Sequence, residues 1–258
     1  MLHHHLLSAT LLLMLALLSS ASPRARNKAA LVHVRVEGSE KTIFEGIVLT
    51  RGHNLTATSG ESHYCDGTNN KTYPHSVPTF TSALDKAAKI DEFNYTAYVN
   101  LYPLANIIFF IEITNINTET FFPRLDDFFI TSIAGEVGSE TQFWGQYLNF
   151  NENQLGGCQI QVKSGDNVLF AFVNVTLPGT KTPLLKLTGP HFVHSHKAVI
   201  LTVTDGQDGS VVAGADVNGQ KTNAEGQVSF TFERFSWIRV KAEKSGAVRS
   251  NQLDILVF

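Results

Sequence analysis

Residues 30–50 read ALVHVRVEGSEKTIFEGIVLT, and their side chains alternate as those of a β-hairpin do. Every second residue from 32 to 36 is valine, and the positions between them hold His33 and Arg35. One face of this strand is therefore apolar. The tripeptide Gly38-Ser39-Glu40 supplies a turn, and residues 42–50 resume the strand pattern. We expect the chain to open with an antiparallel hairpin.

The rest of the first half adds one helix and several strands. A helix is predicted over residues 82–89, where Ser82 can serve as the cap and Asp85 follows three residues later, as in a capping box. A turn at Gly165-Asp166-Asn167 precedes the final strand. The predicted strands cover residues 93–102, 107–114, 128–134, 143–149, 159–163 and 168–175. This pattern favours an α+β domain over residues 30–176, with one helix on a mostly antiparallel sheet.

The second half has a different sequence pattern. Residues 177–183, LPGTKTP, are typical of a linker because they hold two prolines and a glycine. Residues 184–258 carry short strands at close spacing, separated by Asp-Gly, Asn-Gly and Glu-Gly turns, without a helical period. This spacing predicts an all-β sandwich. The fold class expected for the whole chain is mostly β.

Composition narrows the class of protein. The 258 residues include 20 basic and 23 acidic residues, a net charge of −3, and 43% are hydrophobic. This balance argues against a nucleic-acid partner and against intrinsic disorder. Eighteen Phe and 19 Gly beside two Met favour sheets and turns over helices, and two Cys are too few for a multi-cysteine zinc module.

The N-terminus resembles a secretory signal. Residues 6–18 are apolar except for Ser8 and Thr10, a run too short to span a bilayer, and Ser20-Ala21-Ser22 offers a cleavage site. The preceding residues depart from the usual pattern because they contain histidines and no Lys or Arg. An uncleaved anchor is the alternative. We expect residues 1–22 to be a signal peptide, the mature chain to have no transmembrane segment and the protein to be secreted.

Secretion permits a disulfide between Cys65 and Cys158, the only cysteines, and the alternative is two separate buried thiols. Sequons for N-glycosylation begin at Asn54, Asn70, Asn94 and Asn174. Chains rich in Asn, Ser and Thr carry such sequons by chance. Asn70 is the favoured acceptor because it lies in a polar loop.

The first half resembles a known family. The residues that carry the resemblance are 143–149 (FWGQYLN), 156–158 (GGC) and 162–170 (VKSGDNVLF), with further pieces at 42–46, 50–53, 63–69 and 82–85. Together they resemble the transcobalamin-like secreted domain called domain of unknown function number 4430. The resemblance covers residues 30–176 and implies a β-grasp-like fold. Residues 101–122 depart from it, since they are longer and more apolar than the family's segment.

The second half resembles bacterial-type immunoglobulin-like repeats and prealbumin-like extracellular modules. The residues that carry this resemblance are 203–206 (VTDG), 213–215 (AGA), 222–226 (TNAEG) and 240–242 (VKA). It implies an immunoglobulin-like β-sandwich over residues 184–258. A fold shared this widely implies no particular function.

Two groups of polar residues are candidate metal sites. His194 and His196 would share a face if their segment were an extended strand, and imidazole pairs bind zinc. No carboxylate or thiol lies beside them by spacing, so the competing interpretation is an exposed segment between domains. His53, His63 and Asp66 form a looser group near Cys65. We expect neither a metal nor another cofactor.

Catalytic motifs are missing from the sequence. It has no Gly-x-Ser-x-Gly, no His-Glu-x-x-His and no phosphate-binding glycine loop. Asp126 and Asp127 are adjacent, so on a strand they would point to opposite faces and could not act as an acid/base pair. A non-enzymatic protein is therefore expected, and a hydrolase is the less favoured alternative.

Aromatic residues supply the remaining candidates. Trp144 and Tyr147 are the predicted ligand-binding residues, because aromatic rings stack on flat ligands. The competing interpretation, which we favour, places them in a Phe-rich core. Four further aromatic residues could contribute to the same surface: Tyr95, Tyr98, Tyr102 and Phe143.

The expected function is that of a secreted binding or adhesion protein whose extracellular partner, a protein, glycan or small molecule, is unknown. The alternative is a secreted carrier of a carbohydrate or of a flat molecule such as a corrinoid or tetrapyrrole. Vertebrate relatives of the transcobalamin-like domain use it as one half of a cobalamin clamp. The other half of that clamp is a helical barrel, which has no counterpart in this sequence.

Overall fold

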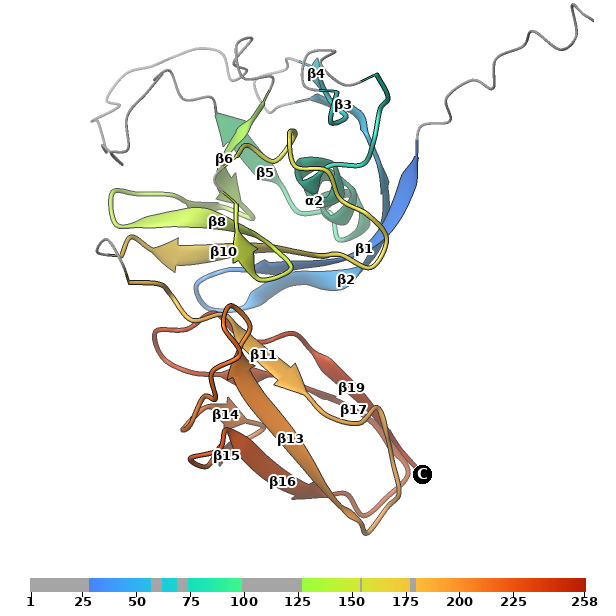
Figure 1. Ribbon diagram of the computed structural model, residues 1–258, viewed down its shortest axis with the longest axis vertical. Coiled ribbons are helices and arrows are strands. Elements are labelled where there is room, and N and C mark those ends of the chain that lie inside the picture. Colours follow the sequence, from blue (N-terminus) through green and yellow to red (C-terminus); the bar gives the residue numbers. More distant parts are fainter. Residues whose placement is uncertain (1–27, 57–61, 69–73, 99–126, 154, 177–179) are drawn as a thin grey trace, which may run out of the picture.

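A computed structural model describes residues 28–56, 62–68, 74–98, 127–153, 155–176 and 180–258 (Figure 1). The predicted signal peptide, Asn70, Tyr102 and the predicted strand 107–114 lie outside the described residues. The chain is mostly β throughout, as predicted, with one helix among the described residues. The first half comprises residues 28–176 and the second half residues 184–258.

A five-stranded sheet organises the first half. Its strand order is β2 (Thr42–Arg51), β1 (Ala29–Glu37), β10 (Asn167–Asn174), β8 (Gln142–Leu148) and β9 (Asn151–Glu152). β1 and β2 form the predicted hairpin, and the final strand β10 runs parallel to β1 at the centre of the sheet. An opening hairpin joined to a central parallel last strand, with a helix on one face, is the β-grasp arrangement.

The helix α2 (Phe80–Ile90) covers the inner face of this sheet and begins earlier than predicted. Its cap is Thr79, whose hydroxyl accepts a hydrogen bond from the Ser82 backbone N–H, while the Ser82 hydroxyl accepts one from the Thr79 N–H. The prediction that Ser82 is the cap is therefore wrong. Phe80 is fully buried with its ring 4.6 Å from that of Phe170, and this packing holds the two added residues at the start of the helix.

Smaller elements complete the first half. They are the hairpin β3 (His53–Thr56) with β4 (Ser62–Cys65), and the sheet formed by β5 (Tyr95–Tyr98), β6 (Phe129–Ile133) and β7 (Glu136–Val137). The strand predicted at residues 159–163 does not form, since only an isolated bridge joins Gln161 to Thr79. The Asp127 carboxylate accepts the backbone N–H groups of Cys158 and Gln159, so these donors need no neighbouring strand.

The second half is the predicted β-sandwich. One sheet contains β11 (Leu185–Thr188), β13 (Ala198–Asp205) and β16 (Gln227–Thr231), and another contains β12 (Phe192–Val193), β19 (Leu253–Val257) and β17 (Ser236–Val240). A third holds β15 (Gln220–Lys221), β14 (Asp216–Val217) and β18 (Ala242–Glu243). The chain changes sheets between β11 and β12, and β12 pairs parallel to β19. Apolar residues that alternate along the strands fill the space between the sheets.

Each half has its own hydrophobic core, and a smaller cluster joins them. The first core draws on residues 30–170 and the second on residues 185–257. Leu184 and Val248 of the second half pack with four buried residues on the outer face of the five-stranded sheet, which are Tyr147, Leu169, Ala171 and Val173. Within the predicted linker the structure describes residues 180–183, and the Pro183 carbonyl accepts a hydrogen bond from the Val248 N–H.

Candidate functional site

The predicted ligand-binding residues of β8 are both buried. Trp144 is 4% exposed, lies 5.2 Å from the Phe172 ring and donates its indole N–H to the Glu136 carbonyl at 2.9 Å. Tyr147 is 5% exposed and packs in the cluster between the two halves, where burial and the nearby charge of Glu152 raise its pKa to about 12. The two rings belong to different hydrophobic clusters, and neither is available to an incoming ligand.

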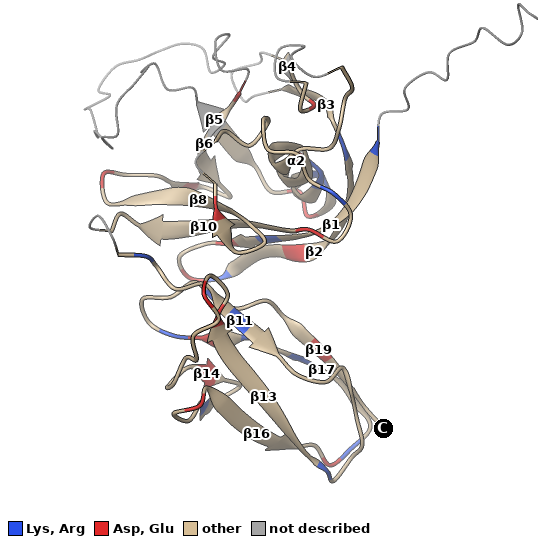
Figure 2. Ribbon diagram, viewed as in Figure 1, with Lys and Arg blue, Asp and Glu red and all other residues tan. Residues whose placement is uncertain are grey.

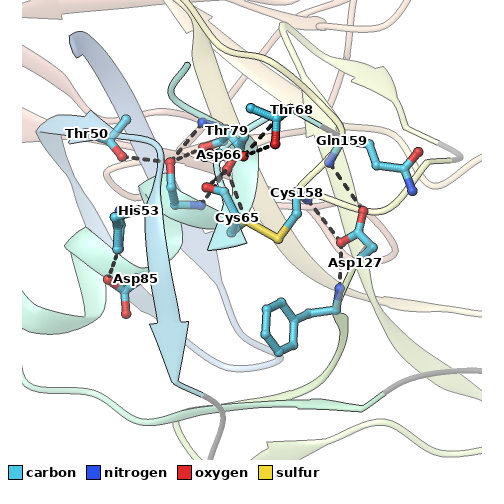
Figure 3. Close-up of a disulfide and its surroundings, with 12 residues drawn as sticks. Thr50, His53, Cys65, Asp66, Thr68, Thr79, Asp85, Asp127, Cys158 and Gln159 are labelled. Carbon is cyan, nitrogen blue, oxygen red and sulfur yellow. Dashed lines mark hydrogen bonds and ion pairs between the residues drawn. A yellow bond between two sulfur atoms is a disulfide. The ribbon is translucent and has the colours of Figure 1, made fainter. Parts of the chain in front are cut away.

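The disulfide is present. Cys65 and Cys158 are bonded with an S–S distance of 2.07 Å and a Cα–Cα distance of 4.7 Å (Figure 3), so the alternative of two separate thiols is wrong. Beside it, the buried Asp127 carboxylate accepts backbone N–H groups from Phe128 and Cys158 at 2.6 and 3.0 Å. These contacts give Asp127 a structural role beside the disulfide, where they hold the backbone at Cys158 in place.

The structure pairs His53 with Asp85 instead of Asp66 (Figure 3). His53 Nε2 lies 2.6 Å from Asp85 Oδ2, and its Nδ1 lies 2.7 Å from the Arg51 carbonyl. Each ring nitrogen therefore lies against an oxygen acceptor, and neither faces a hydroxyl or thiol nucleophile. Asp66 instead accepts the N–H and hydroxyl of Thr68, and the side chain of His63 is outside the described atoms.

The buried carboxylate of Asp85 on α2 accepts hydrogen bonds from several side chains. Lys89 Nζ lies 2.7 Å from it and the Tyr95 hydroxyl 3.1 Å. Burial alone would raise the pKa of Asp85, but hydrogen bonds from His53 and Lys89 outweigh it and hold the pKa below its usual value. This carboxylate therefore stabilises the packing of the helix on β3.

The two histidines weighed as metal ligands do not lie on one strand. β12 ends at Val193, and the following residues turn, with His196 in the left-handed region at φ 61°. His194 instead packs against Phe258, with ring centroids 4.3 Å apart and ring planes tilted by 60°. The premise that both share a strand face is wrong. In the part of the chain that the structure describes, no group of three or more His, Cys, Asp or Glu could hold a metal ion.

Three of the four sequon asparagines lie at the surface. Asn54, Asn94 and Asn174 are exposed, and the Asn174 side chain accepts a hydrogen bond from Gln142. Asn54 lies on β3 with exposed Tyr64 opposite it on β4.

An exposed surface that sequence reasoning missed lies on the outer face of the β12–β19–β17 sheet. Phe192, Leu256 and Trp237 stand in register across these strands, and we call them the aromatic row. Phe192 is 69% exposed and Trp237 61%, while Leu256 between them is half-buried. Strands are spaced about 4.8 Å apart, so the two aromatic side chains project from backbones roughly 10 Å apart.

A polar row runs beside the aromatic row on the same face. Asp254 and Arg239 are opposite each other two residues along their strands, with Arg239 Nε 3.6 Å from Asp254 Oδ1. Gln252 Nε2 donates to the same carboxylate oxygen at 2.9 Å, and exposed His191 hydrogen-bonds the Asp254 carbonyl through Nδ1. An apolar stripe flanked by charged and amide groups is typical of a site that binds a ligand with apolar faces and polar edges.

The signal for Trp237 was present in the sequence as strand alternation. Val240 is buried and Ile238 is packed against the core, so Trp237 and Arg239 must point to the opposite face. The family resemblance points to Trp144 instead, because Trp144 lies in the stretch that carries it.

Comparison with known proteins adds no assignment: no protein-family model matches the chain, and no curated protein matches it. The resemblance of residues 30–176 to the transcobalamin-like family therefore stays a prediction. The helix α2 is 11 residues long, and within the described ranges no helix has the length and apolar character needed to cross a bilayer.

Proposed function

We propose that the protein is an extracellular, non-enzymatic binding protein that holds a glycan chain on the aromatic row of its second half. The observation that carries the proposal is the pair of exposed aromatic side chains, Phe192 and Trp237, beside the polar row of Asp254 and Arg239. Exposed aromatic side chains aligned across a sheet are costly in water unless a partner covers them.

The chemistry of sugars matches both rows. A pyranose ring presents C–H groups on its faces, which pack against aromatic rings, and hydroxyl groups at its edge, which exchange hydrogen bonds with side chains. Asp254 accepts such bonds and Arg239 donates them, and charge-assisted hydrogen bonds are stronger than neutral ones. The spacing of the two aromatic side chains suits alternate rings of an extended chain lying across the strands.

Other observations support the remaining parts of the proposal. The disulfide suits an oxidising compartment, which agrees with the predicted signal peptide. The engagement of both nitrogens of His53 by acceptors supports a structural role for the His53–Asp85 pair and with it a non-enzymatic protein. The burial of Trp144 and Tyr147 weakens the alternative that the first half carries a flat corrinoid-like molecule.

Affinity electrophoresis of the full chain through gels that contain β-glucan, mannan, xylan or chitin derivatives tests this function. We expect retardation by at least one polysaccharide and a loss of affinity of about tenfold or more in Trp237→Ala and Phe192→Ala. The matched control is Tyr64→Ala, which removes an aromatic ring that is 67% exposed in the first half and should leave binding unchanged. Equal retardation of Trp237→Ala and wild type, or no retardation of wild type by any of these polysaccharides, would overturn the proposal.

A further inference from the structure

A sequon and an exposed aromatic ring face each other on the β3–β4 hairpin. Asn54, the first residue of the sequon Asn54-Leu55-Thr56, is paired with Tyr64 in the antiparallel register of the two strands. Side chains of directly opposite residues lie on the same face of a strand pair, with Cβ atoms about 4.5–5.5 Å apart. The amide of Asn54 and the ring of Tyr64 are therefore neighbours.

Both side chains lie on the solvent face of the hairpin. Leu55 is 2% exposed and Cys65 is fully buried, so the residues that alternate with Asn54 and Tyr64 turn toward the core. On the opposite face Asn54 and Thr56 are exposed, and Tyr64 is 67% exposed. This face has room for a group attached to Asn54.

The rest of the solvent face suits a neutral sugar. The strands β3 and β4 contain no Lys, Arg, Asp or Glu (Figure 2), so a sugar here displaces no water from a charged group. The hydroxyls of Thr56 and Ser62 lie 2.7 Å apart on this face. N-Acetylglucosamine presents C–H groups that pack on an aromatic ring and hydroxyls that exchange hydrogen bonds with such groups and with water.

The other sequons that the structure describes have different neighbours. Asn174 is opposite Gln142, whose Nε2 donates to Asn174 Oδ1 at 3.1 Å. Asn94 lies just before β5, and its carbonyl accepts the N–H of Ala134. Among the described sequons, Asn54 alone has an exposed aromatic ring opposite it.

We propose that Asn54 carries an N-linked glycan whose first N-acetylglucosamine packs on the ring of Tyr64. The glycan comes from a lipid-linked oligosaccharide pyrophosphate in the secretory pathway. Nδ2 of Asn54 forms a bond to C1 of the first sugar and loses a proton. The bond from C1 to the pyrophosphate oxygen breaks, and the lipid pyrophosphate leaves with the electron pair.

The sugar joins the two strands of a short hairpin. A two-stranded hairpin has little stability of its own. A sugar attached to β3 and packed on β4 covers the apolar surface of the Tyr64 ring, and it does so only when the hairpin is folded. The glycan therefore stabilises the folded hairpin. Figure 1 shows the hairpin at the end of the first half that lies away from the second half, so the glycan leaves the aromatic row uncovered.

The full chain secreted from yeast, a host that attaches N-linked glycans, tests the modification. Enzymatic deglycosylation in heavy-oxygen water converts each glycosylated Asn into labelled Asp, which peptide mass spectrometry detects. We expect the label at position 54. Secreted protein with Asn54 unmodified would overturn the proposal.

The contact with Tyr64 is tested after an endoglycosidase has trimmed each glycan to a single N-acetylglucosamine. We expect trimmed wild type to melt roughly 2–4 °C above trimmed Asn54→Gln. In a Tyr64→Ala background, the same removal of the sugar from position 54 should change the melting temperature little. The matched control is Asn174→Gln, which removes a sequon without an opposing ring and should have little effect in either background.

Nuclear magnetic resonance gives a readout that does not depend on stability, because an aromatic ring shifts the proton signals of a sugar packed on it. We expect an upfield shift for the sugar on Asn54 relative to free N-acetylglucosaminyl-asparagine, and loss of this shift in Tyr64→Ala. A sugar on Asn54 without the shift, or a gain in melting temperature that persists in Tyr64→Ala, overturns the proposal. The shift together with loss of the gain in Tyr64→Ala establishes it.

Discussion

The two tryptophans lie in strands of similar length and have opposite environments. Trp144 on β8 is 4% exposed, whereas Trp237 on β17 is 61% exposed. β8 lies inside a sheet that is covered on both faces, by the core with α2 on one and by the second half on the other. β17 is an edge strand of a sheet with only its inner face in the core. The number of layers over a strand, more than its aromatic content, determines whether an aromatic residue can bind a ligand.

The largest expected effect is the loss of stability in Trp144→Ala. Removing this ring from the core should lower the free energy of unfolding by about 3–5 kcal/mol. The same change at Trp237 should alter it by less than about 0.5 kcal/mol, because exposed side chains contribute little. Urea unfolding followed by circular dichroism measures both variants. Equal losses in the two would contradict the contrast between the strands.

The next largest effect compares the stabilities of the two halves when the disulfide, which lies in the first half, is removed. Replacing Cys65 and Cys158 together with Ser should destabilise the first half by about 2–5 kcal/mol, since the bond closes a loop with a sequence separation of 93. The second half should unfold as before. Fluorescence of Trp144 and Trp237 in variants that keep only one of them separates the two transitions, and a matching shift in the Trp237 transition would count against independent cores.

The sequence predicts the strands better than it predicts the surfaces. Alternation places β1, β2, β8 and β10 within one residue of their observed ends, because burial of one face has a period of two. It also predicts the sandwich of the second half. The cap at Thr79 was missed because Thr79 and Ser82 are equally good capping residues, and only the burial of Phe80 distinguishes them.

The candidate site could be predicted only in part. Alternation marks Trp237 as pointing outward. The sequence around Trp237 does not show that Phe192 and Leu256 lie in register with it, because β12 and β17 each pair with β19 and not with each other. The contact of His53 with Asp85 likewise joins residues 32 positions apart. Pairings of this kind arise from tertiary packing.

A smaller effect concerns the stability of the first half at acidic pH. The pKa of Asp85 is lower in the folded protein than its ordinary value, so its contribution to stability is present above that ordinary value, near 3.8, and is lost as the pH falls through the folded pKa. We expect the melting temperature of the first half to fall with acidification in this range. Asp85→Asn should flatten the plot of melting temperature against pH in this range. An unchanged plot would show that Asp85 does not cause this pH dependence.

The most direct test of the contrast follows each tryptophan during titration with the polysaccharide that retards the protein most. In Trp144→Phe the remaining Trp237 should change its fluorescence as ligand binds and become protected from acrylamide quenching. In Trp237→Phe the buried Trp144 should resist acrylamide from the start and show no response to ligand. A response from Trp144, with none from Trp237, would contradict the assignment of the binding surface to the second half.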